Sequence, residues 1–178
     1  MCMRESALPL LLALASAPSL GAPEGPRLGQ PLEPTAIATL DITVFPDGTG
    51  LPPGQGTAVE GKAIYDARCA ACHGPNGSGG SAEELAGGRN PLTHAEPDKT
   101  IGTYWPYAST VFDFIRRSMP LDAPRSLSND ETYAVTAYLL HANGIIGERD
   151  RLDAATLPKI RMPNAAGFVR AYPEPQSR

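Results

Sequence analysis

Two cysteines and a histidine lie close together in this 178-residue chain, in the segment Cys69-Ala-Ala-Cys72-His73. Residues three apart lie on one face of a helix, so the two thiols can each form a thioether with one vinyl group of a haem. The adjacent imidazole is then held against one face of the ring and aimed at the iron. The segment therefore predicts one covalent haem c, attached through Cys69 and Cys72, with His73 as an iron ligand.

Two other uses of this segment fit it less well. A redox dithiol uses a C-x-x-C pair alone and gives no role to His73. A zinc site needs about four ligands, but the sequence has no second cysteine pair, and its third cysteine, Cys2, lies near the N-terminus.

The iron of such a haem needs a sixth ligand or an open position, and the candidates are His94, His141, Met119 and Met162. We favour Met119, which lies in a loop between two expected helices. Pro120 follows it and disfavours helical backbone at Met119. The alternative for any single methionine is packing in the core. Histidine and methionine together raise the reduction potential and favour electron transfer over oxygen chemistry.

Other residues are candidates for the surroundings of the haem. A metal-bound histidine usually donates its other ring N–H to an acceptor such as a carbonyl, and the carbonyl of Pro91 is a reasonable partner for His73. Arg89, Tyr104 and Trp105 are candidates to bind the haem propionates. Their alternatives are a solvated charge for the arginine and ordinary packing for the aromatic residues.

The helices that must position these residues have recognisable starts. Thr57 and Glu60 form a T-x-x-E capping box that predicts a helix to about Ala71. Gly61 lies one turn before Tyr65 and leaves a gap where another helix can approach closely.

Two more helices are expected after the motif. Ser109 or Thr110 is a possible N-cap for a helix to about Arg117, with three apolar residues on one face: Val111, Phe114 and Ile115. Ser128 and Glu131 form a second capping box. That box opens a helix with Val135, Tyr138, Leu139 and Ala142 at helical spacing, which Gly144 is placed to stop.

The two ends of the chain differ from this helical region, which we place at residues 57–144. Residues 1–21 read as a signal peptide, with a short apolar run followed by small residues, so we expect a periplasmic protein without a permanent membrane span. Residues 22–56 form a Pro/Gly-rich arm, in which Ile37–Phe45 has the alternation of one short strand. Residues 145–178 form a proline-containing C-terminal extension. The net charge of −4, with no run of Lys or Arg, argues against a nucleic-acid partner.

Residues 57–144 resemble a class I cytochrome c domain. The resemblance rests on Gly61 and Tyr65, the Cys69–His73 segment, Met119-Pro120 and Tyr138. It implies a mostly α fold, here with extended N- and C-terminal arms. It also implies that His73 and Met119 are the two axial ligands, and that the first and last helices cross at the glycine and the aromatic residues.

A narrower resemblance covers most of the expected mature chain. Five segments are similar to the SoxD-type haem subunits of bacterial sulfite and sulfur dehydrogenases: Leu51-Pro-Pro-Gly-Gln-Gly56, Gly102-Thr-Tyr-Trp-Pro-Tyr107, Phe112-Asp-Phe-Ile-Arg-Arg-Ser-Met-Pro120, Tyr133-Ala-Val-Thr-Ala-Tyr-Leu-Leu140 and Lys159-Ile-Arg-Met-Pro-Asn164. In that family a molybdenum subunit oxidises the sulfur compound. The cytochrome takes the electrons singly and passes them to another cytochrome c or a terminal oxidase. Larger members can carry a second haem domain, whereas this chain has one C-x-x-C-H.

The resemblance therefore implies an electron-transfer subunit rather than a catalytic one, within a sulfite:cytochrome c oxidoreductase or a related complex. Two alternatives stay open. One is a catalytic cytochrome such as a thiosulfate dehydrogenase, which would need an open iron or an unusual ligand. The other is a general cytochrome c shuttle to a terminal oxidase.

Overall fold

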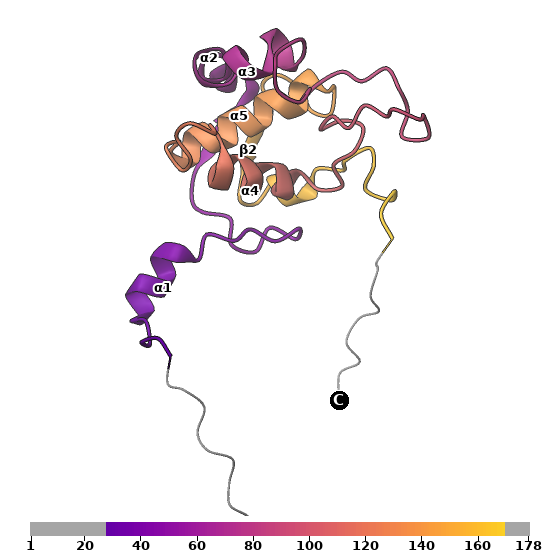
Figure 1. The fold of residues 1–178 in the computed structure, drawn as a ribbon. Coiled ribbons are helices and arrows are strands. Elements are labelled where there is room, and N and C mark those ends of the chain that lie inside the picture. Colours follow the sequence, from indigo (N-terminus) through magenta and orange to yellow (C-terminus); the bar gives the residue numbers. More distant parts are fainter. Residues whose placement is uncertain (1–27, 170–178) are drawn as a thin grey trace, which may run out of the picture.

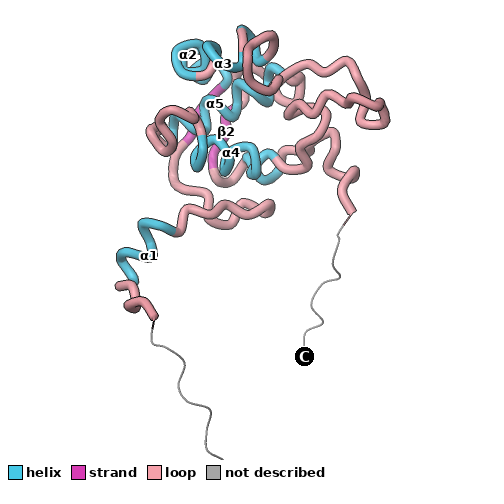
Figure 2. The backbone as a smooth tube through the Cα atoms, viewed as in Figure 1, coloured by secondary structure: helices cyan, strands magenta, loops and turns pink. Residues whose placement is uncertain are grey.

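The computed structural model describes residues 28–169, so the predicted signal peptide and the first part of the predicted arm lie outside the described residues. The described chain is mostly helical, as the sequence predicts (Figures 1 and 2). Its helices are α1 (Pro34–Leu40), α2 (Ala58–Arg68), α3 (Ala70–His73), α4 (Ala108–Ser118) and α5 (Asn129–Ala142), with two 3-10 turns, η1 (Pro75–Gly77) and η2 (Leu157–Lys159). Two short strands, β1 (Gln55–Thr57) and β2 (Arg151–Asp153), complete it.

Helix α5 lies at the centre and packs against α2 on one side and α4 on the other (Figure 1). The crossing of α2 and α5 depends on Gly61, because a Cβ atom at this position would meet the carbonyl oxygen of Ala134 at 1.9 Å. One turn further on, the rings of Tyr65 and Tyr138 pack with their centroids 4.9 Å apart. The predicted close approach at Gly61 is therefore confirmed.

Both predicted capping boxes are present, at Thr57 with Glu60 and at Ser128 with Glu131. The first helix ends earlier than predicted. Cys69 has non-helical backbone angles (φ −125°, ψ −37°), so α2 ends at Arg68. Cys69 lies between the two helices, and the rest of the haem motif forms the separate short helix α3.

Helix α4 begins at Ala108, and neither Ser109 nor Thr110 is its N-cap. The hydroxyl of Ser109 instead donates to the carbonyl of Pro46, 2.8 Å away, and ties α4 to the N-terminal arm. The predicted apolar face was also partly wrong. Phe112 is fully buried against Tyr133, whereas Phe114 is 45% exposed.

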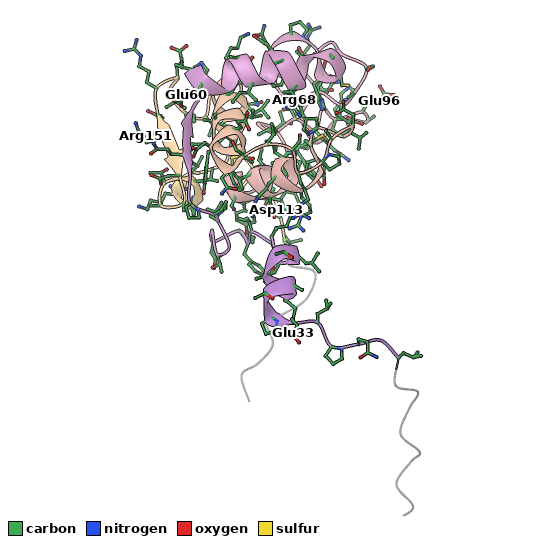
Figure 3. The ribbon with its side chains drawn as sticks, turned by 90° about the vertical axis from the view of Figure 1, so that its left-hand side faces the viewer. Glu33, Glu60, Arg68, Glu96, Asp113 and Arg151 are labelled. Carbon is green, nitrogen blue, oxygen red and sulfur yellow. The ribbon has the colours of Figure 1, made fainter. Side chains whose placement is uncertain are left out.

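The strand predicted for Ile37–Phe45 was wrong, because residues 34–40 form α1. Pro34 stands in the first turn of this helix, where its missing N–H is not needed. The chain after α1 is bonded to α4, since the amide of Val44 donates to Asp113 Oδ1 at 3.0 Å. Figure 3 shows Asp113 on the side of the body that faces the arm.

The C-terminal extension contains structure that the sequence did not predict. Strand β2 pairs antiparallel with β1, with Gly56 opposite Leu152. Leu157 and Met162 then enter the core. Within residues 28–169, no helix is both long and apolar enough to cross a membrane.

Candidate haem-binding site

A cavity of about 970 Å³ lies between α3, α4 and α5 and is also lined by residues 81–85 and 99–105. This volume is at the upper end of the range of about 300–1,000 Å³ for small-molecule sites. Its wall is mainly apolar and includes Leu85, Ile101, Trp105, Phe114, Val135 and Leu139. Phe114 therefore contributes to the cavity wall instead of the core. Its ring packs edge to face against the ring of Trp105, with the centroids 5.7 Å apart. Such a space fits a large, flat, apolar cofactor.

Cys69, Cys72 and His73 all line this cavity. Both thiols are free, and Cys69 is half-buried while Cys72 is exposed. Burial raises the pKa of the Cys69 thiol, partly offset by the nearby Arg68 guanidinium. Two reduced thiols at the wall of one cavity are the arrangement that thioether attachment requires.

The imidazole of His73 is oriented by the backbone. Its Nδ1 atom lies 2.7 Å from the carbonyl oxygen of Glu83. A carbonyl only accepts hydrogen bonds, so Nδ1 carries the proton and Nε2 keeps the lone pair that binds a metal. The predicted acceptor, the carbonyl of Pro91, was wrong, because the His73 ring meets the Glu83 carbonyl, while the Pro91 carbonyl accepts from the amide of His94 at 2.9 Å.

The loop that carries Glu83 is packed tightly onto the motif. The amide of Ala82 donates to the carbonyl of Cys72 at 2.8 Å. A Cβ atom at Gly80 would lie 2.1 Å from the same Cys72 carbonyl oxygen, and one at Gly74 would lie 2.0 Å from the carbonyl oxygen of Ser78. Glycine at these positions lets the loop fold over α3 and present the Glu83 carbonyl to the ring.

Met119 also lines the cavity, directly after α4. Its backbone is extended (φ −115°, ψ 148°), as the following proline favours. Its amide donates the last hydrogen bond of the helix to the carbonyl of Ile115, 3.0 Å away. Among the described residues that line the cavity, Met119 is the one methionine. The side chain of Met162 is only 3% exposed and belongs to the hydrophobic core. Met162 therefore has the packing role that was the alternative to iron binding.

The residues predicted to bind propionates fall into two groups. Tyr104 and Trp105 line the cavity, whereas Arg89 is not among the lining residues. Two cations that the sequence reasoning missed, Arg68 and Lys99, do line it. The signal for Arg68 was its place beside Cys69, and the signal for Lys99 was its place in the loop that also carries Tyr104 and Trp105.

Comparisons with known proteins agree with this site. Residues 58–143 match the Cytochrome c family. A chain in the crystal structure of the sulfane dehydrogenase SoxCD from Paracoccus pantotrophus is 43% identical, with a TM-score of 0.75, over 82% of this chain and 72% of that chain.

Two curated relatives are thiosulfate dehydrogenases. The one from Allochromatium vinosum is 34% identical over 66% of this chain, and the one from Stutzerimonas stutzeri is 34% identical over 49%. The chain spans 39% and 28% of their lengths, respectively. The matched residues, the fold and the cavity together show that this chain belongs to the cytochrome c family, with a mostly helical class I fold and one covalent haem c.

Proposed function

We propose that this chain is a one-electron carrier that serves as the haem subunit, or the direct electron acceptor, of a molybdenum-containing sulfite or sulfur dehydrogenase. The observation that carries the proposal is the extent of the likeness to the SoxCD chain. It covers 82% of this chain, and so reaches beyond the cytochrome domain at residues 58–143 into the flanking segments.

The residues of the cavity suit electron transfer. Cys69 and Cys72 would hold the haem through two thioethers, and His73 and Met119 would supply the two protein ligands of its iron. The bound haem c supplies the chemistry, which is the reversible uptake of one electron by Fe(III). The apolar wall would limit the access of water to the iron, and with both ligands bound the iron would have no position open for a substrate.

The expected compartment is the periplasm. Haem attachment needs reduced thiols and takes place outside the cytoplasmic membrane, which agrees with the signal peptide predicted at residues 1–21. Oxidation of a sulfur compound at a molybdenum centre releases two electrons. Because this chain has one haem motif, it would take them in two successive encounters or pass the first to a downstream cytochrome c or oxidase.

The second candidate is a catalytic cytochrome, which the 34% identity to two thiosulfate dehydrogenases favours. Catalysis at this haem would require displacement of Met119 or a cysteine ligand. In the described residues the two cysteines are Cys69 and Cys72, and both are used for attachment. The electron-carrier proposal therefore explains the site with fewer changes.

The test is haem reduction followed by absorbance, with sulfite or thiosulfate as donor, with and without a catalytic amount of the host's molybdenum sulfur dehydrogenase. Reduction only when the enzyme is present supports the proposal. Reduction by thiosulfate without the enzyme, continuing for many turnovers with ferricyanide as acceptor, would replace it by the catalytic alternative. A haem that dithionite reduces but neither mixture reduces would point to a general shuttle.

A further inference from the structure

The loop after α3 supplies a cation and a phenol to the wall of the haem cavity. Lys99 and Tyr104 both line it, and the Lys99 ammonium lies 5.6 Å from the centroid of the Tyr104 ring. The loop is fixed at its centre, where the amide of Ile101 donates to the carbonyl of Leu85 at 3.1 Å and the amide of Gly102 to Asn143 Oδ1 at 3.1 Å. Both Lys99 and Tyr104 are exposed, so these anchors alone do not fix their side chains.

The C-terminal extension reaches the same loop. The Nδ2 atom of Asn164 donates to the carbonyl of Tyr104 at 2.8 Å. The ring of Phe168 meets the ring of Tyr104 edge to face, with the centroids 5.3 Å apart. Tyr104 is thus held by its backbone and by its ring, and both contacts come from residues about sixty positions away in the sequence.

This part of the extension is itself well anchored. Met162 is buried in the core at its start. A turn follows, in which the amide of Gly167 donates to the carbonyl of Asn164 at 3.0 Å. A Cβ atom at Gly167 would lie 1.9 Å from Asn164 Oδ1, so glycine there leaves room for the Asn164 side chain in its observed position. Figure 1 shows the C-terminal segment leaving the body on the same side as the long loop between α3 and α4.

Haem carries its two propionates on the edge of the ring opposite the two vinyl groups. Arg68 adjoins Cys69, where a vinyl group is attached, and its Nη2 atom already donates to the hydroxyl of Ser126 at 2.7 Å. Lys99 comes from a different wall of the cavity and is the other basic side chain there. An ammonium and a phenol hydroxyl are both donors that a carboxylate accepts.

We propose that Lys99 and Tyr104 bind the haem propionates, and that residues 162–168 form a C-terminal strap that positions this pair through Asn164 and Phe168. The strap residues do not touch the haem and are positioning residues. A cation fixed near the haem destabilises Fe(III), which carries one more positive charge than Fe(II), and so raises the reduction potential. This inference rests on the haem site of the proposed function and does not depend on the sulfur partner.

The test compares reduction potentials of the purified holoprotein in four forms: wild type, the pair variant Lys99→Gln/Tyr104→Phe, the strap variant Asn164→Ala/Phe168→Ala, and the four substitutions combined. The pair variant should lower the potential because the ammonium and the phenol hydroxyl that bind the propionates are lost. The strap variant should lower it by a smaller amount because Lys99 and Tyr104 are no longer held. In the background of the pair variant the strap substitutions should have almost no further effect, since coupled residues are not additive.

Val169→Ala is the matched control, because Val169 adjoins Phe168 and is 92% exposed. It should keep the wild-type potential and melting temperature. A strap variant with the wild-type potential would overturn the proposal. So would a drop of equal size in the wild-type and the Lys99→Gln/Tyr104→Phe backgrounds, because the strap would then act without this pair. Potentials are measured on covalently loaded protein, so failure of haem attachment is seen separately and tests the proposed function instead.

Discussion

The Nδ1 atom of His73 lies 2.7 Å from the carbonyl oxygen of Glu83, ten residues further along the chain. This contact sets the tautomer of the ring and leaves the lone pair on Nε2, the atom that would bind the iron. Since the acceptor is a backbone atom, its position depends on the fold of the loop that carries Glu83, which contains Gly74 and Gly80, and not on the glutamate side chain. The loop glycines are therefore part of the haem site.

Gly80→Ala should disturb this loop, because the new Cβ atom would lie 2.1 Å from the carbonyl oxygen of Cys72. We expect a lower yield of covalent haem and an altered ferric absorption spectrum. Gly79→Ala is the control, because a Cβ atom there meets nothing within 4 Å and the cost is limited to its positive φ of 77°, about 1–2 kcal/mol. Equal haem yields and spectra in the two variants would contradict the role given to the loop.

Met119→Ala should leave the haem attached but open the iron. The ferric protein should then bind imidazole or cyanide, and its reduction potential should fall because a thioether ligand is lost. Met162→Leu is the control, because it keeps the core volume and should cost less than about 1.5 kcal/mol of stability. Ligand binding by the Met162 variant, with none by the Met119 variant, would exchange the roles of the two methionines.

Gly61→Ala should destabilise the folded protein, because α2 and α5 cross closely here. The added Cβ atom would lie 1.9 Å from the carbonyl oxygen of Ala134. Forcing a methyl group into a packed interface costs about 1–3 kcal/mol, part of which the better helix propensity of alanine offsets. Urea unfolding of the holoprotein measures the change. Val59→Ala on the same helix, where the side chain is 53% exposed, should change the free energy of unfolding far less.

The capping box at the start of α5 makes stability depend on pH. Hydrogen bonds from the backbone and hydroxyl of Ser128 lower the pKa of Glu131 from its usual 4.5. A lowered folded-state pKa means that the contribution is complete above the unfolded pKa and is lost as the pH falls through the folded one. Glu131→Gln should therefore cost about 0.3–1 kcal/mol at pH 7.

That difference between wild type and Glu131→Gln should shrink below about pH 4.5. Urea unfolding at pH 7, 5 and 3.5 measures it. A difference that stays constant over this range would show that the carboxylate charge of Glu131 does not contribute.

Features that depend on residues close together in the sequence could be predicted. The two capping boxes, the close approach at Gly61 and the stop at Gly144 each depend on neighbouring residues and helix geometry, and all four are present. The attachment motif is of the same kind, because its spacing alone specifies the chemistry.

Features that depend on distant contacts could not be predicted. The hydroxyl of Ser109 was a candidate helix cap, but it donates instead to the carbonyl of Pro46 in the N-terminal arm. Residues 34–40 form a helix, although the alternation of apolar and polar residues in this region favoured a strand. Among the described residues, the sheet consists of β1 and β2 alone, so a strand here would have no partner. The choice of Glu83 over Pro91 as the hydrogen-bond partner of His73 follows from how the loop after the motif folds over α3. No local signal in the sequence encodes that path.

Covalent attachment of one haem through Cys69 and Cys72 is tested by the intact mass of the protein, purified from a host with a haem-attachment system and extracted with acid–acetone. We expect a mass increase of one haem for the wild type and none for Cys69→Ala/Cys72→Ala. Loss of haem from the wild type on extraction, or haem retained by the double variant, would contradict it.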